Sequence, residues 1–346
     1  MVYVSAERRR FVSQWLYTIA FLVLAMLTLG GLTRLTGSGL SMVEWRPLMG
    51  AIPPLNQADW QEVFALYQQY PEYKLHNHRM TLGEFEFIFM MEYSHRLLGR
   101  FIGLVFFLPM VFFFLKGWLS SAMKRRCLFL FFLGGLQGVV GWYMVKSGLV
   151  DVPRVSQYRL TLHLLLAAIT LTLSLWYAFD LRPAPAEAEQ RNLAPLSGGS
   201  LALLWLIAAQ ITSGGFVAGL KAGFAYNTFP SMNGSLIPPG LFDGGPWLLN
   251  FLENPVTVQF VHRWLAMVVA VAVLIFFFRH RKAAFNSHLK PAMIALPCLL
   301  LIQVGLGIAT LLLVVPTGLA SAHQVVAMLL WSTAIYIRHG VARNTA

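Results

Sequence analysis

The sequence is poor in charged residues. Asp, Glu, Lys and Arg make up only 12% of its 346 residues, whereas 57% are hydrophobic, and the mean hydropathy is +0.63. Soluble domains carry about 25% charged residues, so this composition excludes an ordinary soluble protein. It indicates an all-α polytopic membrane protein.

Cysteine is nearly absent. The two thiols, Cys127 and Cys298, lie in or beside apolar runs on the side of the membrane that we expect to be cytoplasmic. This placement excludes a disulfide on the outer face, where oxidising surroundings would allow one. It also excludes thiolate ligands at the histidines described below.

Acidic residues are scarce as well. The chain has 14 Asp and Glu against 26 Lys and Arg, a net charge of +12. Most cations fall between apolar runs on one side, for example at residues 8–10, 124–126 and 279–282, whereas most acids fall on the other side. Cations gathered in this way mark cytoplasmic loops, so we expect both termini in the cytoplasm and no nucleic-acid partner.

Long apolar runs are abundant. A bilayer core of about 30 Å needs about 20 apolar residues in a helix, and eight runs satisfy this. Residues 1–180 and 201–346 hold four runs each, joined by a linker over 181–200 that is rich in Pro, Ala and charge. The runs cover residues 12–32, 95–115, 128–145, 160–179, 201–220, 261–278, 293–314 and 319–337.

The N-terminal segment bears on location. The first run begins after about ten residues, which leaves no room for a mitochondrial transit peptide, and the run is too long for a cleaved signal. Three arginines precede it. We therefore expect a multi-pass protein of the bacterial inner membrane.

One loop, over residues 41–91, is much longer than the others. Apolar residues recur at helical spacing over 59–67, which predicts a short amphipathic helix along the outer membrane surface. Thr81 followed by Glu84 has the pattern of a capping box. The next helix is therefore expected to begin near Thr81, before the chain enters the bilayer.

Motifs of the first half recur in the second half in the same order. Gly30-Gly31 corresponds to Gly214-Gly215, His95-Arg96 to His262-Arg263, Gln137 to Gln303 and His163 to His323. Internal similarity in a fixed order is typical of duplication. We therefore expect two tandem, pseudo-symmetric four-helix bundles.

Four of the nine histidines lie near the outer, periplasmic ends of even-numbered runs. They are His95, His163, His262 and His323. Two imidazoles in each half could face each other across a bundle core. Zinc would need further ligands, so paired axial imidazoles with flanking glycines and many aromatics favour haem iron. Haem propionates need cations near water, and the candidates are Arg34, Arg96, Arg159 and Arg263.

The two halves differ beside the histidines. Glu92 precedes His95 by three residues and shares its helix face, whereas the second half has Gln259 at this offset. An ionisable side chain in a membrane is costly and indicates function. Chemistry is therefore assigned to the first half and a permanent cofactor to the second.

These motifs resemble the haem A synthase family, the Cox15/CtaA proteins, over essentially the whole chain. The most specific stretches are residues 31–36, 38–47, 70–73 and 91–97. The long first loop resembles the mitochondrial and proteobacterial branch. The cysteine pair that some bacterial members carry in this loop is missing here.

The resemblance implies oxidation of a methyl group of haem O, by successive hydroxylations, to the formyl group of haem A. It implies haem b on His262 and His323, and substrate haem near His95 and His163. Glu92 would act as a base or as an anion that stabilises developing positive charge. A haem O synthase and assembly factors of cytochrome oxidase are implied partners.

Two other functions stay open. A di-haem b quinol oxidoreductase would carry electrons without altering either haem. A haem transporter or chaperone would need paired histidines but not Glu92. The sequence names neither the electron-transfer partner nor the oxygen source, and homo-oligomers are possible.

Overall fold

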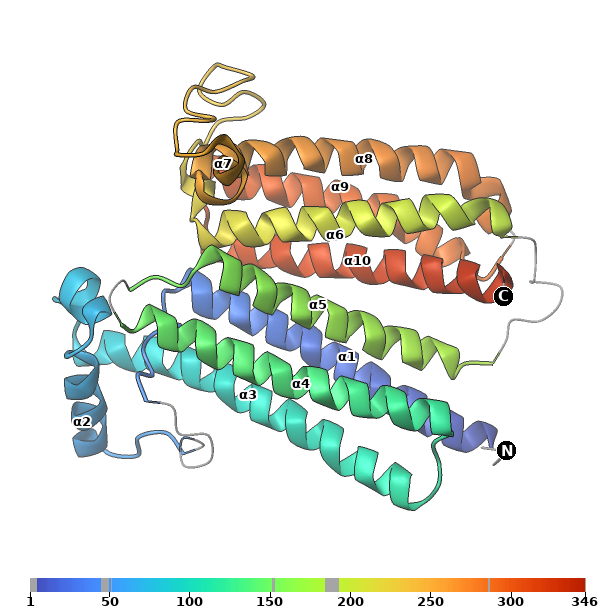
Figure 1. Cartoon of the computed structure of the whole chain (residues 1–346), viewed down its shortest axis with the longest axis horizontal. Coiled ribbons are helices and arrows are strands. Elements are labelled where there is room, and N and C mark those ends of the chain that lie inside the picture. The colour runs from blue at the N-terminus through green and yellow to red at the C-terminus, as the bar shows by residue number, and fades with distance from the viewer. Residues whose placement is uncertain are drawn as a thin grey trace. The chain divides into compact units, whose positions relative to one another are not determined.

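The computed structural model describes residues 5–44, 50, 52–150, 153–183, 193–285 and 287–345. Within these ranges the chain is helical, without a β-strand (Figure 1). Trp45, Arg46 and Pro47 of the family motif, and residues 184–192 of the predicted linker, lie outside the described residues.

Eight helices are long and apolar enough to cross a membrane, which confirms the predicted polytopic all-α fold. Each exceeds the predicted run at one or both ends, because polar residues continue the helix beyond the apolar stretch. They are α1 (Ala6–Leu35), α3 (Leu82–Leu115), α4 (Ser121–Gly148), α5 (Gln157–Asp180), α6 (Ser197–Gly219), α8 (Pro255–Phe285), α9 (Lys290–Leu312) and α10 (Thr317–Thr345).

Short helical segments occupy the connections. The chain also contains α2 (Gln57–Tyr67), a π turn at Tyr73–Asn77, α7 (Asn250–Glu253), and 3₁₀ turns at Ala194–Leu196, Ala222–Phe224 and Trp247–Leu249. The helix expected over residues 59–67 is thus confirmed as α2. Its position on a membrane surface stays a prediction.

The described residues form two compact units. The first unit is Phe21–Thr170, and the second unit combines Met1–Ala20 with Leu171–Ala346. The tandem pseudo-symmetric bundles, and the predicted boundaries at residues 180 and 201, stay predictions.

In the first unit, α3 begins with a complete capping box. The Thr81 hydroxyl accepts a hydrogen bond from the backbone N–H of Glu84, and Glu84 accepts from the backbone N–H of Thr81 at 2.8 Å. The 34 residues of α3 make a helix about 51 Å long, which exceeds a bilayer core of about 30 Å. Its first turns pack against α2 through Phe85, Phe89 and Tyr67.

In the second unit, α6, α8, α9 and α10 lie side by side (Figure 1). The ends of α1 and α5 in this unit are joined by a hydrogen bond from Ser13 to the carbonyl of Ala178. The Trp331 indole donates to Thr172 at 2.9 Å, and His339 lies 2.7 Å from Asp180, so α10 is fastened to α5.

Candidate functional site

The four predicted histidines, two in each unit, all pack in the same way. Each imidazole lies against a glycine of the preceding long helix. A Cβ atom built on Gly30 of α1 would lie 3.0 Å from His95 Nε2 on α3. A Cβ on Gly141 of α4 would lie 3.0 Å from His163 Cε1 on α5.

The second unit repeats this arrangement. A Cβ on Gly214 of α6 would lie 3.3 Å from His262 Cε1 on α8, and one on Gly307 of α9 would lie 2.9 Å from His323 Cε1 on α10. Contacts this short leave little room for any side chain at these glycines. The predicted correspondence of His95 with His262, and of His163 with His323, therefore extends to their helix contacts.

Within each unit the two histidines lie within range of an electrostatic interaction. His95 and His163 are close enough to interact electrostatically, and so are His262 and His323. That the two imidazoles of a unit face each other across a bundle core stays a prediction.

These residues fit haem better than a bare metal ion. Among the described residues, no group of three or more His, Cys, Asp or Glu side chains could hold a metal ion. Two imidazoles alone leave most of a coordination sphere unfilled, and a porphyrin supplies the four missing nitrogens. The glycines beside the rings also suit a ligand with a flat face.

Hydrogen bonds orient the two histidines of the second unit. His262 Nδ1 lies 2.8 Å from Ser213 Oγ and 3.2 Å from Gln210 Nε2. His323 Nδ1 lies 3.2 Å from the carbonyl oxygen of Gln303. Amide groups also lie beside the other ring nitrogens, with Gln210 Nε2 3.3 Å from His262 Nε2 and Gln303 Nε2 3.2 Å from His323 Nε2. Both rings are therefore held in place by polar neighbours.

The histidines of the first unit are held differently. His163 Nδ1 is buried and has no hydrogen-bond partner among the described residues. Gln137 reaches only the backbone carbonyl of His163, at 3.0 Å. The positions that match Gln210 and Ser213 are Met26 and Leu29, which cannot donate to the His95 ring.

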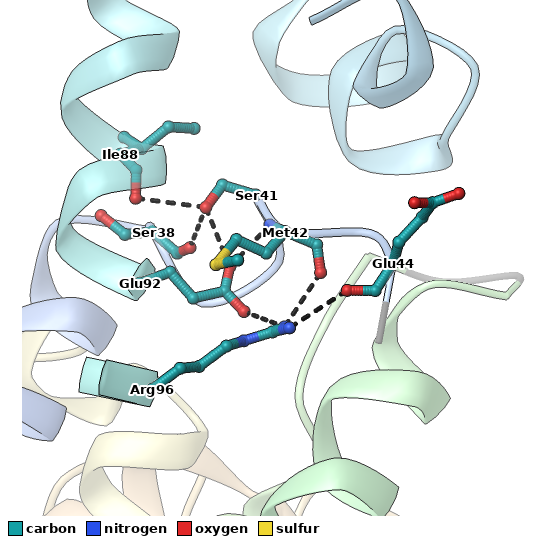
Figure 2. Close-up of polar contacts among 7 residues, drawn as sticks. All are labelled: Ser38, Ser41, Met42, Glu44, Ile88, Glu92 and Arg96. Atoms are coloured by element: carbon teal, nitrogen blue, oxygen red, sulfur yellow. Dashed lines mark hydrogen bonds and ion pairs between the residues drawn. The ribbon is translucent and has the colours of Figure 1, made fainter. Parts of the chain in front are cut away.

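Glu92 lies at the centre of a polar network that joins α3 to the loop after α1 (Figure 2). Its side chain is buried, with 3% of the residue exposed. One carboxylate oxygen accepts hydrogen bonds from the Ser41 hydroxyl and the Met42 N–H, both at 2.8 Å. The other accepts from Arg96 at 2.5 Å.

Arg96 extends the same network. Its guanidinium also donates to the carbonyl oxygens of Met42 at 2.9 Å and Glu44 at 3.2 Å. Glu92 and Arg96, one helical turn apart, therefore fasten the loop to α3 (Figure 2). Sequence reasoning had placed Glu92 beside the haem and missed its partners Ser41 and Met42, because they are about 50 positions away in the chain.

In the second unit, Gln259 and Arg263 likewise fasten the loop after α6 to α8, but here the helix side chains donate to the loop. Gln259, which is 3% exposed, donates to the carbonyl oxygens of Ala222 at 2.9 Å and Tyr226 at 3.0 Å. Arg263 donates to Tyr226 at 2.7 Å and Thr228 at 2.8 Å. The carboxylate of Glu92 accepts every one of these hydrogen bonds, whereas the amide of Gln259 donates to the loop and accepts only from Arg263, at 3.2 Å.

The other two predicted arginines belong to the first unit. Arg34 lies in the last turn of α1 and is partly buried. Arg159 stacks on the ring of Tyr143, with its guanidinium carbon 4.4 Å from the ring centroid, and donates to the Tyr143 hydroxyl at 3.2 Å. Both remain candidates for binding propionates.

Sequence reasoning did not single out Gly141, Gly307, Gln210 or Ser213. Gly141 belongs to a glycine-rich face whose other members, Gly134, Gly135 and Gly138, have nothing within 4 Å of an added Cβ. The sequence does contain a pattern that points to two of these glycines. Gly141 follows Gln137 by four residues, and Gly307 follows Gln303 by the same distance.

The chain matches the family model COX15-CtaA, described as a cytochrome oxidase assembly protein, over residues 13–335. It is 50% identical over 331 residues to a protein of Maricaulis maris named Heme A synthase, covering 96% of both chains. It is 49% identical to one so named from Nitrosospira multiformis, covering 95% of this chain and 93% of that protein. With Heme A synthase COX15 of Homo sapiens it shares 44% identity over 349 residues, covering 98% of this chain and 84% of the human protein. This protein therefore belongs to the COX15-CtaA family.

Proposed function

We propose that this protein is a haem A synthase, an oxidoreductase that converts a methyl group of haem O into the formyl group of haem A. One observation of the structure carries the proposal: four partly buried imidazoles, two in each unit, each packed on a glycine. The naming of relatives that match nearly the whole chain gives the reaction. The membrane helices suit a substrate as apolar as haem O.

The two units divide the work. We assign haem O to His95 and His163, and haem b to His262 and His323. The hydrogen bonds to His262 and His323 support this division, because a permanent cofactor gains from ligands held in one orientation. The rings of a site that exchanges its ligand need less of this restraint.

In this scheme the side chains of the protein bind and orient the two haems and place a charge near the substrate. Haem b, when bound in the second unit, supplies a one-electron redox centre. Imidazoles of the first unit position the substrate, and Gly30 and Gly141 allow the rings to sit close to the helices. Glu92 places a negative charge one turn from His95 and keeps the loop after α1 closed over this end of α3.

The proposed setting is the bacterial inner membrane. Both termini would lie in the cytoplasm, as the basic segments indicate, and both haem sites would lie near the periplasmic side. A haem O synthase would supply the substrate, and cytochrome oxidase assembly factors would receive the product. An electron-transfer partner and self-association belong to the same scheme.

Extraction and chromatographic separation of haems tests the function directly. Cells that supply haem O should accumulate haem A when they express this chain and only haem O when they do not. Accumulation of haem O alone in both cultures would contradict the proposal and would favour the electron-carrier or transporter alternatives.

A further inference from the structure

A pocket of about 380 Å³ lies in the first unit, between the loop after α1, the start of α3 and the end of α4. Its lining includes Met42, Tyr70, Arg96, Trp142 and Lys146. The volume is in the range of small-molecule sites, and the lining combines apolar surface with a few cations, as such sites do.

Two cations near this end of α4 rest on aromatic rings of that helix. The Lys146 ammonium lies 5.0 Å from the centroid of Trp142, and Arg159 lies 4.4 Å from that of Tyr143. An aromatic face holds a cation in place without neutralising its charge, so both remain able to bind an anion. Arg96, by contrast, is engaged by Glu92 and two loop carbonyls (Figure 2).

The cations lie a short distance from the histidine pair. Trp142 directly follows Gly141, which packs on His163. Lys146 is five residues beyond Gly141, or about 7.5 Å along α4, and Arg159 is four residues before His163, or about 6 Å along α5. A flat ligand bound at His163 would therefore extend one edge toward both cations.

The second half has none of the two aromatic residues, Trp142 and Tyr143, or of the two cations that rest on them, Lys146 and Arg159. With Gln137 aligned to Gln303 and Gly141 to Gly307, Trp142, Tyr143 and Lys146 match Ile308, Ala309 and Leu312. With His163 aligned to His323, Arg159 matches Leu319. The histidines and their glycines are duplicated, but the aromatic-backed cations are not. They belong to the half that we assign to the exchanging ligand.

We propose that Lys146, held on Trp142, binds a propionate carboxylate of the substrate haem at this pocket, with Arg159 on Tyr143 beside it. This inference rests on the proposed function, because it takes haem O as the ligand of the first unit. An exchanging ligand must rebind its carboxylates at each turnover, which exposed, pre-positioned cations allow. Lys146 is exposed, as this role requires.

Haem O binding to the purified full chain tests the inference independently of turnover. The variants are Lys146→Leu, which introduces the residue of the second half, and Lys124→Leu as matched control. Lys124 is on the same helix and also stacks on an aromatic ring, 5.5 Å from the Phe114 centroid, but at the opposite end. Each protein is titrated with haem O and with its propionate dimethyl ester, followed by absorbance.

Lys146→Leu should weaken haem O binding roughly fivefold, the scale of one partly exposed ion pair. The wild type and Lys124→Leu should prefer haem O to its diester, and Lys146→Leu should have lost most of that preference. Equal affinity and equal ester discrimination in all three proteins would overturn the inference. So would a Lys146→Leu loss that is the same for haem O and the diester, which would indicate an anionic lipid or a packing role.

The two proposals fail separately. If cells expressing the wild type make haem A while the three proteins bind haem O and its diester alike, the assignment of Lys146 is wrong and the synthase function stands. If the wild type makes no haem A and binds no haem O, the proposed function fails first.

Discussion

Among single residues, Glu92 and Gln259 are the most informative pair. Both are 3% exposed, both lie one turn before an arginine, and both fasten a loop to the helix that carries a histidine. What separates them is charge. The loops account for part of this difference, because the first loop offers donors to Glu92 and the second offers carbonyl oxygens to Gln259. A catalytic role of the negative charge stays a prediction.

Replacement of Glu92 by Gln separates these roles. Glu92→Gln should keep the fold and haem binding, because an amide oxygen can still accept from Arg96 as Gln259 does from Arg263, although the amide N–H would face the Met42 N–H and loosen the loop. Haem A formation should fall by at least roughly a hundredfold, the usual size of a lost acid–base or charge-stabilising group. Chromatography of extracted haems measures the product, and absorbance of the purified variant measures bound haem.

Gln259→Leu is the matched control, since it removes the corresponding fastening in the second unit without placing a carboxylate against the carbonyl oxygens of Ala222 and Tyr226, and it should leave haem A formation largely intact. Normal haem A levels with Glu92→Gln would show that the carboxylate only anchors the loop. Loss of all bound haem in this variant would instead point to a collapse of the first unit.

The glycines beside the histidines allow a second test at this scale. Gly307→Ala places a Cβ 2.9 Å from His323 Cε1, which must displace a stiff ring, and should weaken haem b binding roughly tenfold. Gly305→Ala is the control on the same helix, because an added Cβ there meets nothing within 4 Å. Haem content per purified protein distinguishes them, and equal content would contradict the role of Gly307.

At the scale of elements, the contact between α2 and α3 depends on a small aromatic core. Tyr67 is fully buried, stacks on Phe85 with ring centroids 5.0 Å apart, and accepts a hydrogen bond from Asn77 at 2.7 Å. Burial raises the pKa of the Tyr67 hydroxyl, and the carboxylate of Glu72 raises it further. Keeping this hydroxyl neutral is therefore part of the stability of the contact.

The sign of the resulting pH dependence follows from linkage. A raised pKa in the folded state gives stability that is fully present below the unfolded pKa of about 10 and is lost as the pH rises above it. Hydrogen exchange at residues 82–89, after correction for its intrinsic pH dependence, should show the α2–α3 contact loosening between about pH 9 and pH 11.

Tyr67→Phe should show little of this loosening, because it removes the titrating group. The variant should have a lower starting stability, by about 1 kcal/mol, for the lost bond to Asn77. The same pH response in the wild type and in Tyr67→Phe would show that another group controls this contact.

At the scale of the whole molecule, the duplicated histidines predict two haem sites of unequal permanence. The second unit holds His262 and His323 by hydrogen bonds to Ser213, Gln210 and Gln303, whereas the first unit leaves His163 Nδ1 without a partner among the described residues. Haem bound in the second unit should therefore survive purification better than haem in the first.

Histidine replacement tests this inequality. His323→Ala should abolish the haem b absorbance of the purified protein, whereas His163→Ala should leave it nearly unchanged and abolish haem A formation. His76→Ala, at an exposed position before α3, is the control and should alter neither. Full haem b absorbance in His323→Ala would mean that the permanent cofactor lies elsewhere.

The sequence by itself determined the features that depend on nearby residues. Hydropathy predicted eight membrane helices, because crossing a bilayer requires about 20 apolar residues in one stretch. Thr81 and Glu84 predicted the start of α3 because a capping box is made within a single turn. The repeat predicted which histidines correspond, since a duplication preserves their order.

Only the tertiary structure decided which residues meet across helices. Of four glycines on one face of α4, Gly141 alone contacts a histidine, and this depends on how α5 packs against α4. The orientation of Glu92 toward Ser41 and Met42 depends on the path of a loop that no local pattern encodes. Contacts between distant segments are set by packing of the whole unit, so local patterns could supply the candidate residues but not their partners.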